Sequence, residues 1–134
     1  MVNMISVRNV TRVVSILGII SLLGCATQYQ AYDGPKLSSE KIAVVNGATN
    51  FLPGTTSLSI SSVDGKPLSP YKGSVEVLPG RHVFGVQHYF HAGGGLVAKG
   101  EVTVDAQAGK TYQLASKSDG NYVTFSVAEA VNVK

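Results

Sequence analysis

The strongest constraint on the fold is an alternation of apolar and polar residues that begins near Lys41 and continues through most of the chain. In TTSLSISSV, residues 55–63, Leu58 and Ile60 fall on one face and serines fall on the other. A period of two is typical of a β-strand that buries one of its faces. Beyond an apolar run near the N-terminus, no window repeats at the spacing of an amphipathic helix. The pattern therefore predicts an all-β fold.

Turn signals such as Asp64-Gly65 and Pro79-Gly80 divide this region into short segments. The expected strands are 41–45, 55–63, 74–78, 81–91, 96–104, 111–116 and 122–130. About seven short strands with turns every 8–12 residues or so are typical of a sandwich or small barrel. We expect a small antiparallel β-sandwich over residues 41–134, with Gly100 marking a β-bulge.

Composition supports one folded domain. The chain has 134 residues, of which 44% are hydrophobic and 14% charged, and this balance argues against disorder. Two of the 11 Lys and Arg residues, Arg8 and Arg12, precede the apolar run, so nine remain against eight Asp and Glu. A body so close to neutral lacks the basic patch of a nucleic-acid-binding protein.

The N-terminal segment has the layout of a secretory signal. Two arginines and no acidic residue precede an apolar run at residues 13–23, which is shorter than the ~20 residues of a membrane-spanning helix. Gly24 and Cys25 follow the run, and because Cys25 is the single cysteine, the chain has no internal disulfide. Leu22, Leu23, Gly24 and Cys25 resemble the lipobox of bacterial lipoproteins, with Leu23 where a smaller residue is commoner.

This resemblance implies three regions: a signal peptide at 1–24, a lipidated cysteine with a tether at 25–40, and the β-sandwich at 41–134. Acyl chains such as palmitate on Cys25 would anchor the protein stably in a membrane. Ala26 stands where an Asp would imply retention in the inner membrane, so the resemblance implies the outer membrane, facing the periplasm. The alternative for 25–40 is an edge segment packed through Tyr29 and Tyr32.

A second resemblance involves SSVDGKPL, residues 61–68, and VEVLPGRHVFGV, residues 75–86. Together they resemble a PEGA-type unit, in which a VDG turn is followed by a Leu-Pro-Gly turn, a basic residue and His. With the Tyr-Asp-Gly-Pro stretch at 32–35, they are also similar to a group of small, uncharacterised lipoproteins of Gram-negative bacteria. The resemblance implies an envelope β-domain with no assigned catalytic residues and no cofactor.

His82, His88 and His91 are the candidate metal ligands, because imidazole is a common ligand of transition metals. In a regular strand His82 and His88 share a face but lie about 20 Å apart, and His91 falls on the opposite face. This geometry predicts no metal site. A ligand- or metal-binding lipoprotein that uses these histidines remains the alternative function.

The sequence predicts a binding module rather than an enzyme. It contains no G-x-S-x-G nucleophile elbow, and Gly93–Gly95 leads into a strand, unlike a phosphate-binding loop. The candidate binding residues are His88, Tyr89, Phe90 and His91, an aromatic cluster beside this glycine-rich segment. Alternatively, Phe90 is a core residue and Tyr89 belongs to a cross-strand pair.

The expected function is that of a lipid-anchored, non-enzymatic interaction or scaffold module. Its expected partners are the membrane, reached through the acyl chains, and an envelope protein or cell-wall glycan. A subunit of a secretion assembly is a further possibility. Fold class alone does not decide among these.

Overall fold

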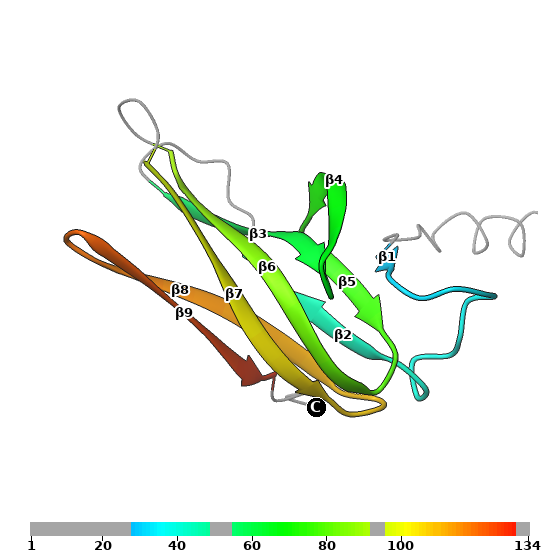
Figure 1. Cartoon of the computed structure of the whole chain (residues 1–134). Helices are drawn as coiled ribbons and strands as arrows, with labels where there is room; N and C mark the ends of the chain where they lie inside the picture. Colours follow the sequence, from blue (N-terminus) through cyan, green and yellow to red (C-terminus); the bar gives the residue numbers. More distant parts are fainter. Residues whose placement is uncertain (1–27, 49–54, 92–95, 131–134) are drawn as a thin grey trace, which may run out of the picture.

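The computed structural model describes residues 28–48, 55–91 and 96–130. Within these ranges the chain forms nine strands in two packed sheets (Figure 1). The strands are β1 (Tyr29–Gln30), β2 (Ala43–Asn46), β3 (Thr56–Val63), β4 (Lys66–Lys72), β5 (Ser74–Val77), β6 (Gly80–Phe90), β7 (Leu96–Ala106), β8 (Thr111–Asp119) and β9 (Tyr122–Glu129). None of the described residues form a helix of the length and apolarity needed to cross a bilayer.

The two sheets enclose one hydrophobic core. The five-stranded sheet has the order β1-β5-β2-β8-β9, and the four-stranded sheet has the order β4-β3-β6-β7. Alternate residues of each strand point between the sheets, and their burial stabilises the sandwich through the hydrophobic effect. The most buried of these are Val45, Val75, Val77 and Leu114 from one sheet and Leu58, Ile60, Phe84 and Val86 from the other. The prediction of an all-β sandwich is confirmed.

The seven predicted strands are all present, but β1 and β4 were not predicted. Pro67 and Pro70 argue against a strand, because proline cannot donate a ladder hydrogen bond. The structure resolves this conflict by placing β4 at the edge of its sheet, where one side of the strand needs no partner. β1 has only two residues, too few to produce an alternating pattern.

Two strand pairs are parallel, so the sandwich is mixed rather than fully antiparallel. β1 pairs parallel to β5 through Tyr29 and Val75. β2 pairs parallel to β8, with Val45 opposite Tyr112, while its other side pairs antiparallel to β5. Alternation along one strand specifies which face is buried, but it carries no information about the direction of the neighbouring strand.

The prediction of a bulge at Gly100 was wrong. Gly100 pairs with Val86 in a β6–β7 register that runs without a shift. A Cβ atom at Gly100 would lie 2.5 Å from Cε2 of Phe125, so this glycine makes room for an aromatic ring of β9. The register shift of the four-stranded sheet lies instead in β3, between Ile60 and Ser62.

Residues 28–41, here called the N-terminal strap, pair with the sandwich through β1 and then run as a largely exposed loop towards β2. Ala31 N–H donates a hydrogen bond to Glu76 O across 2.9 Å, which continues the pairing of β1 with β5. The Gln30 side-chain amide donates to the carbonyl oxygens of Tyr32 and Gly34 and so folds the strap back on itself. β1 thus lies along a sheet edge, and Ala31, rather than the exposed Tyr29, packs against the core.

The strap and the two long hairpins occupy opposite ends of the molecule. β1 lies at one end, and β6, β7 and the β8–β9 turn extend to the other (Figure 1). We call the second region, residues 88–91, 96–98 and 119–122, the hairpin end. All eleven residues of β6 pair with β7.

Candidate binding surfaces at the two ends of the sandwich

The lipobox residues Leu22, Leu23, Gly24 and Cys25 lie outside the described residues. The first described residue, Gln28, is three positions after Cys25 and leads directly into β1. The surface around β1 is therefore the part of the described domain that is nearest to Cys25 along the chain.

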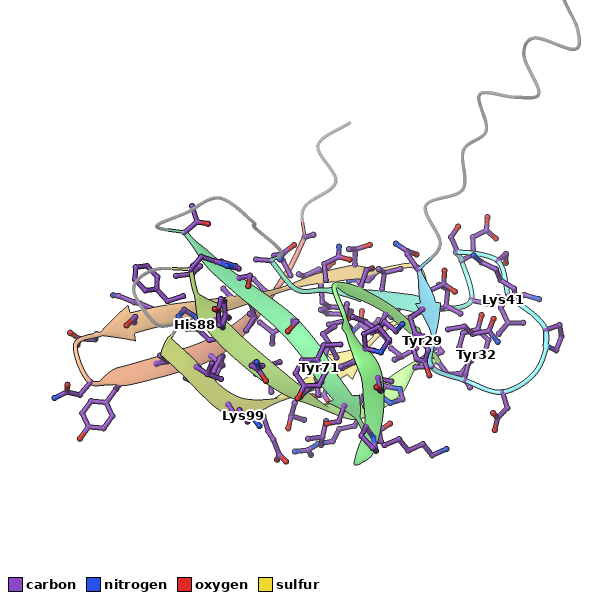
Figure 2. The ribbon with its side chains drawn as sticks, turned by 90° about the horizontal axis from the view of Figure 1, so that it is seen from above. Tyr29, Tyr32, Lys41, Tyr71, His88 and Lys99 are labelled. Carbon is purple, nitrogen blue, oxygen red and sulfur yellow. The ribbon has the colours of Figure 1, made fainter. Side chains whose placement is uncertain are left out.

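Tyr29 and Lys72 form the centre of this surface, which we call the β1 edge. The Lys72 ammonium lies 5.2 Å from the centroid of the Tyr29 ring, a cation–π arrangement. Beside them is a hollow of about 320 Å³ lined by Gln28, Tyr29, Lys72, Gly73 and Ser74. A smaller hollow of about 120 Å³ is also lined by Tyr29 and includes Tyr32, Asp33 and Lys66. Figure 2 shows Tyr29 and Tyr32 together at this end of the molecule.

A buried carboxylate lies next to the strap. Glu76 faces away from the core, opposite to Val75 and Val77, yet its side chain is only 4% exposed. Its Oε1 is 3.5 Å from Lys36 Nζ, and its Oε2 has no hydrogen-bond partner. Burial of a charged group with an unsatisfied oxygen is unfavourable. The cost of burying Glu76 therefore offsets part of the stabilisation that comes from packing of the strap. Local sequence carries no sign of this burial, because it depends on Lys36 and the strap, distant in sequence.

Asp64 and His82 connect the two turns of the PEGA-like segment. His82 Nδ1 is 2.6 Å from Asp64 Oδ2, and His82 Nε2 is 2.7 Å from Leu78 O. Both partners are acceptors, and an imidazolium that donates from both nitrogens satisfies both. Val83 N–H donates to Asp64 Oδ1 across 2.8 Å. This network occupies both ring nitrogens of His82 and gives the residue a structural role.

The surroundings of Asp64 favour its ionised form. Partial burial raises the pKa of its carboxyl group, but this is outweighed by the hydrogen bonds from His82 and Val83 and by the charges of His82 and Lys66. The net result is a lowered pKa. Asp64 also adopts a positive φ of 49°, which Asp and Asn tolerate better than most residues.

His88 is buried between the sheets. It is 2% exposed, and its Nδ1 lies 2.8 Å from Ser116 Oγ on β8. His88 was predicted as a candidate binding residue, but it is not at the surface, because its position in the β6 alternation is that of the core residues Phe84 and Val86. The structure thus separates His88 from the surface part of the predicted binding cluster.

Tyr89 and His91 remain together on the outer face of the hairpin end. Their rings meet edge to face with centroids 4.6 Å apart, and His91 Nε2 lies 3.2 Å from Ser57 Oγ on β3. Phe90, between them in sequence, is half-buried. The hairpin end also carries Tyr122, which is 78% exposed. Of the four predicted binding residues, Tyr89 and His91 are the two that share a surface.

The three histidines do not form a common site. His82 bonds Asp64 and Leu78, His88 bonds Ser116, and His91 lies on the other face of the sheet. Within the described ranges, no group of three His, Cys, Asp or Glu side chains is arranged to hold a metal ion. Comparison of the chain with models of known families, with curated proteins and with solved structures gave no match.

Proposed function

We propose that this protein is a non-enzymatic, lipid-anchored module of the bacterial envelope, attached through acyl chains on Cys25 and facing the periplasm. The observation that carries the proposal is the arrangement of the two ends. The chain that follows Cys25 enters the sandwich at the β1 edge, and the long hairpins extend to the opposite end (Figure 1). A module anchored in this way would present its hairpin end to partners away from the membrane.

The Asp64–His82 network supports the proposed PEGA-like character of residues 60–86. The Asp of the VDG turn and the His that follows the Pro-Gly turn contact each other directly. The spacing of the motif is thus accounted for by one interaction between two turns. The alternative of a histidine-based ligand or metal site has no comparable observation in its favour, and we do not propose it.

Acylation is tested by metabolic labelling with palmitate and fractionation of the envelope. The native chain is expected to carry the label and to remain with the outer membrane, because two or more acyl chains give stable anchoring. Cys25→Ser is expected to lose both properties. Ser21→Ala, which alters the same segment but keeps the cysteine, is the control and should retain both. Unlabelled native protein, or retention of Cys25→Ser in the membrane, would contradict the proposal.

The partner-facing role of the hairpin end is tested by photocrosslinking in intact cells. A crosslinking amino acid at Tyr122 or Tyr89 is expected to capture an envelope protein or cell-wall glycan. Thr103, exposed in the middle of β7, is the control site. Equal capture from Thr103, or none from either tyrosine, would argue against a partner at this end.

A further inference from the structure

We propose that the β1 edge is a lipid-facing surface that rests on phospholipid headgroups, with the Tyr29 ring in the headgroup layer and Lys72 beside lipid phosphates. This inference deepens the proposed function and rests on the acylation of Cys25. It adds a second, non-covalent contact between the protein and the membrane.

The first argument is the length of the link. Tyr29 is four positions after Cys25, and an extended chain spans at most about 14 Å over four Cα-to-Cα steps. No further length is released beyond Tyr29 while the strap is packed, because β1 pairs with β5 and Ala31 bonds Glu76. The headgroup layer on each side of the hydrocarbon is itself about 5–8 Å thick. The β1 edge is therefore held at the membrane surface.

The second argument is the chemistry of this edge. Tyr29 is 38% exposed, and tyrosine rings are enriched where headgroups meet water. The Lys72 ammonium beside the ring and the adjoining hollow give a phosphate a positively charged place to bind. The second hollow carries Lys66 together with Asp33, so its charges balance. The larger hollow is thus lined by a lysine and by no acidic residue, in accord with anionic lipid as its occupant.

The third argument is orientation. β6 alone spans about 33 Å at roughly 3.3 Å per residue, so the hairpin end lies well beyond the headgroup layer when the β1 edge is seated. Tyr122 at that end is the most exposed of the large hydrophobic residues in the described ranges. It serves as an internal control for membrane contact.

The test uses tryptophan as a unique reporter, because the native chain contains none. The lipidated full chain carrying Tyr29→Trp, Gln28→Trp or Tyr122→Trp is reconstituted in vesicles of phosphatidylethanolamine and phosphatidylglycerol with brominated acyl chains. Tyr29→Trp and Gln28→Trp are expected to show blue-shifted emission and about twofold quenching by the bromines, and Tyr122→Trp neither. Gln28→Trp keeps the native tyrosine, so it reports independently if Tyr29→Trp folds poorly.

Two further variants test whether the β1 edge itself binds lipid or is only held near the membrane by its short link to Cys25. Lys72→Gln is expected to reduce the quenching of Gln28→Trp in these anionic vesicles. Insertion of a flexible Gly-Ser segment of about 12 residues between Ala26 and Thr27 should leave most of the quenching in place, because the surface itself binds lipid. Loss of quenching on insertion would show that the short link alone sets the depth, and it would overturn the inference.

The outcomes distinguish this inference from the proposed function. Acyl label on Cys25 with equal quenching at Tyr29→Trp and Tyr122→Trp, or with none at Tyr29→Trp and Gln28→Trp, overturns the lipid-facing surface alone. An emission shift on addition of soluble cell-wall fragments, without quenching, would assign the edge to glycan and also overturn it. Absence of the acyl label overturns the proposed function and the inference together.

Discussion

The β1 edge and the hairpin end are held in place by different kinds of interaction. At the β1 edge, a two-residue strand and a few polar contacts join the strap to the sandwich, and Glu76 is buried with one oxygen unpaired. The hairpin end belongs to two long hairpins, in which β6 pairs with β7 over eleven residues and β8 with β9 over eight, and its His88 packs between the sheets.

This difference indicates how stability is distributed. Long antiparallel ladders between neighbouring strands combine many hydrogen bonds with side-chain packing, and such regions open only at high free energy. The strap has few buried apolar contacts and an ion pair to a largely exposed lysine, which are features of a region that opens more easily. We therefore expect the hairpin end to be rigid, which suits the partner-binding role proposed for it, and the β1 edge to open more easily, which suits the proposed contact with a fluid membrane.

The largest effect is expected at the hairpin end, from His88→Ala. This substitution leaves a cavity between the sheets and removes the partner of Ser116, so we expect a loss of about 3 kcal/mol in the free energy of unfolding. His91→Ala, the same change on the outer face, is the control and should cost less than about 1 kcal/mol. Urea unfolding of the purified chain measures both. Equal losses would show that the burial of His88 does not contribute to stability.

A smaller loss is expected from Gly100→Val. The added side chain would overlap the Phe125 ring, and overpacking of this kind costs about 2 kcal/mol. Phe125→Ala in the same chain should restore part of the stability, because it removes the overlapping ring. If Gly100→Val and the native chain had the same midpoint of urea unfolding, this account of the contact between Gly100 and Phe125 would be contradicted.

At the β1 edge, Lys36→Met is expected to lower the stability of the strap by about 1 kcal/mol, because it leaves the Glu76 carboxylate without its cation. Glu76→Gln removes the buried charge and should be neutral or slightly stabilising. Hydrogen exchange at the Ala31 amide, which bonds Glu76 O, reports on the strap directly. Faster exchange in Lys36→Met but not in Lys36→Met/Glu76→Gln is the expected pattern, and unchanged exchange in both would refute it.

The smallest effect is a pH dependence centred on Asp64. Its pKa in the folded chain is below the ordinary value of 3.8, so the contribution of the ionised carboxylate is complete above about that pH and is lost as the pH falls through the lower folded value. Because Asp64 is half exposed, solvent screens much of this contribution. Asp64→Asn tolerates the same turn conformation and should flatten the acid limb of a plot of Tm against pH. If the Tm of the native chain changed no more with acid pH than that of Asp64→Asn, this carboxylate would have no role in the pH dependence of stability.

The positions of the strands were easier to predict from the sequence than the partner and direction of each strand in its sheet. Alternation and turn residues identified seven strands, because both signals are local. The edge strand β4 was missed because Pro67 and Pro70 are unusual in strands, and the parallel direction of β2 and β8 depends on chain connectivity rather than on either segment. Alternation also places His88 on the core face of β6 with Phe84 and Val86, and this position decides its burial in spite of its polar side chain.

The candidate site was predictable only in part. Tyr89 and His91 were identified as aromatic residues near the tip of a hairpin, and the structure keeps them in contact. The pairing of Tyr29 with Lys72 and the burial of Glu76 by the strap join residues from separate parts of the chain. Such contacts arise from the folded arrangement of strands, and no local pattern encodes them.

The position of β2 affects the order in which the protein can fold. Asn46 in β2 pairs with Gln113 in β8, 67 residues later, so the five-stranded sheet cannot close until the C-terminal hairpin is available. Pairing over such a separation slows folding, because the intervening chain must be closed into a loop first. In a chain exported to the envelope, as proposed here, this delay would keep the emerging polypeptide extended enough to pass through a translocation channel before its last strands arrive.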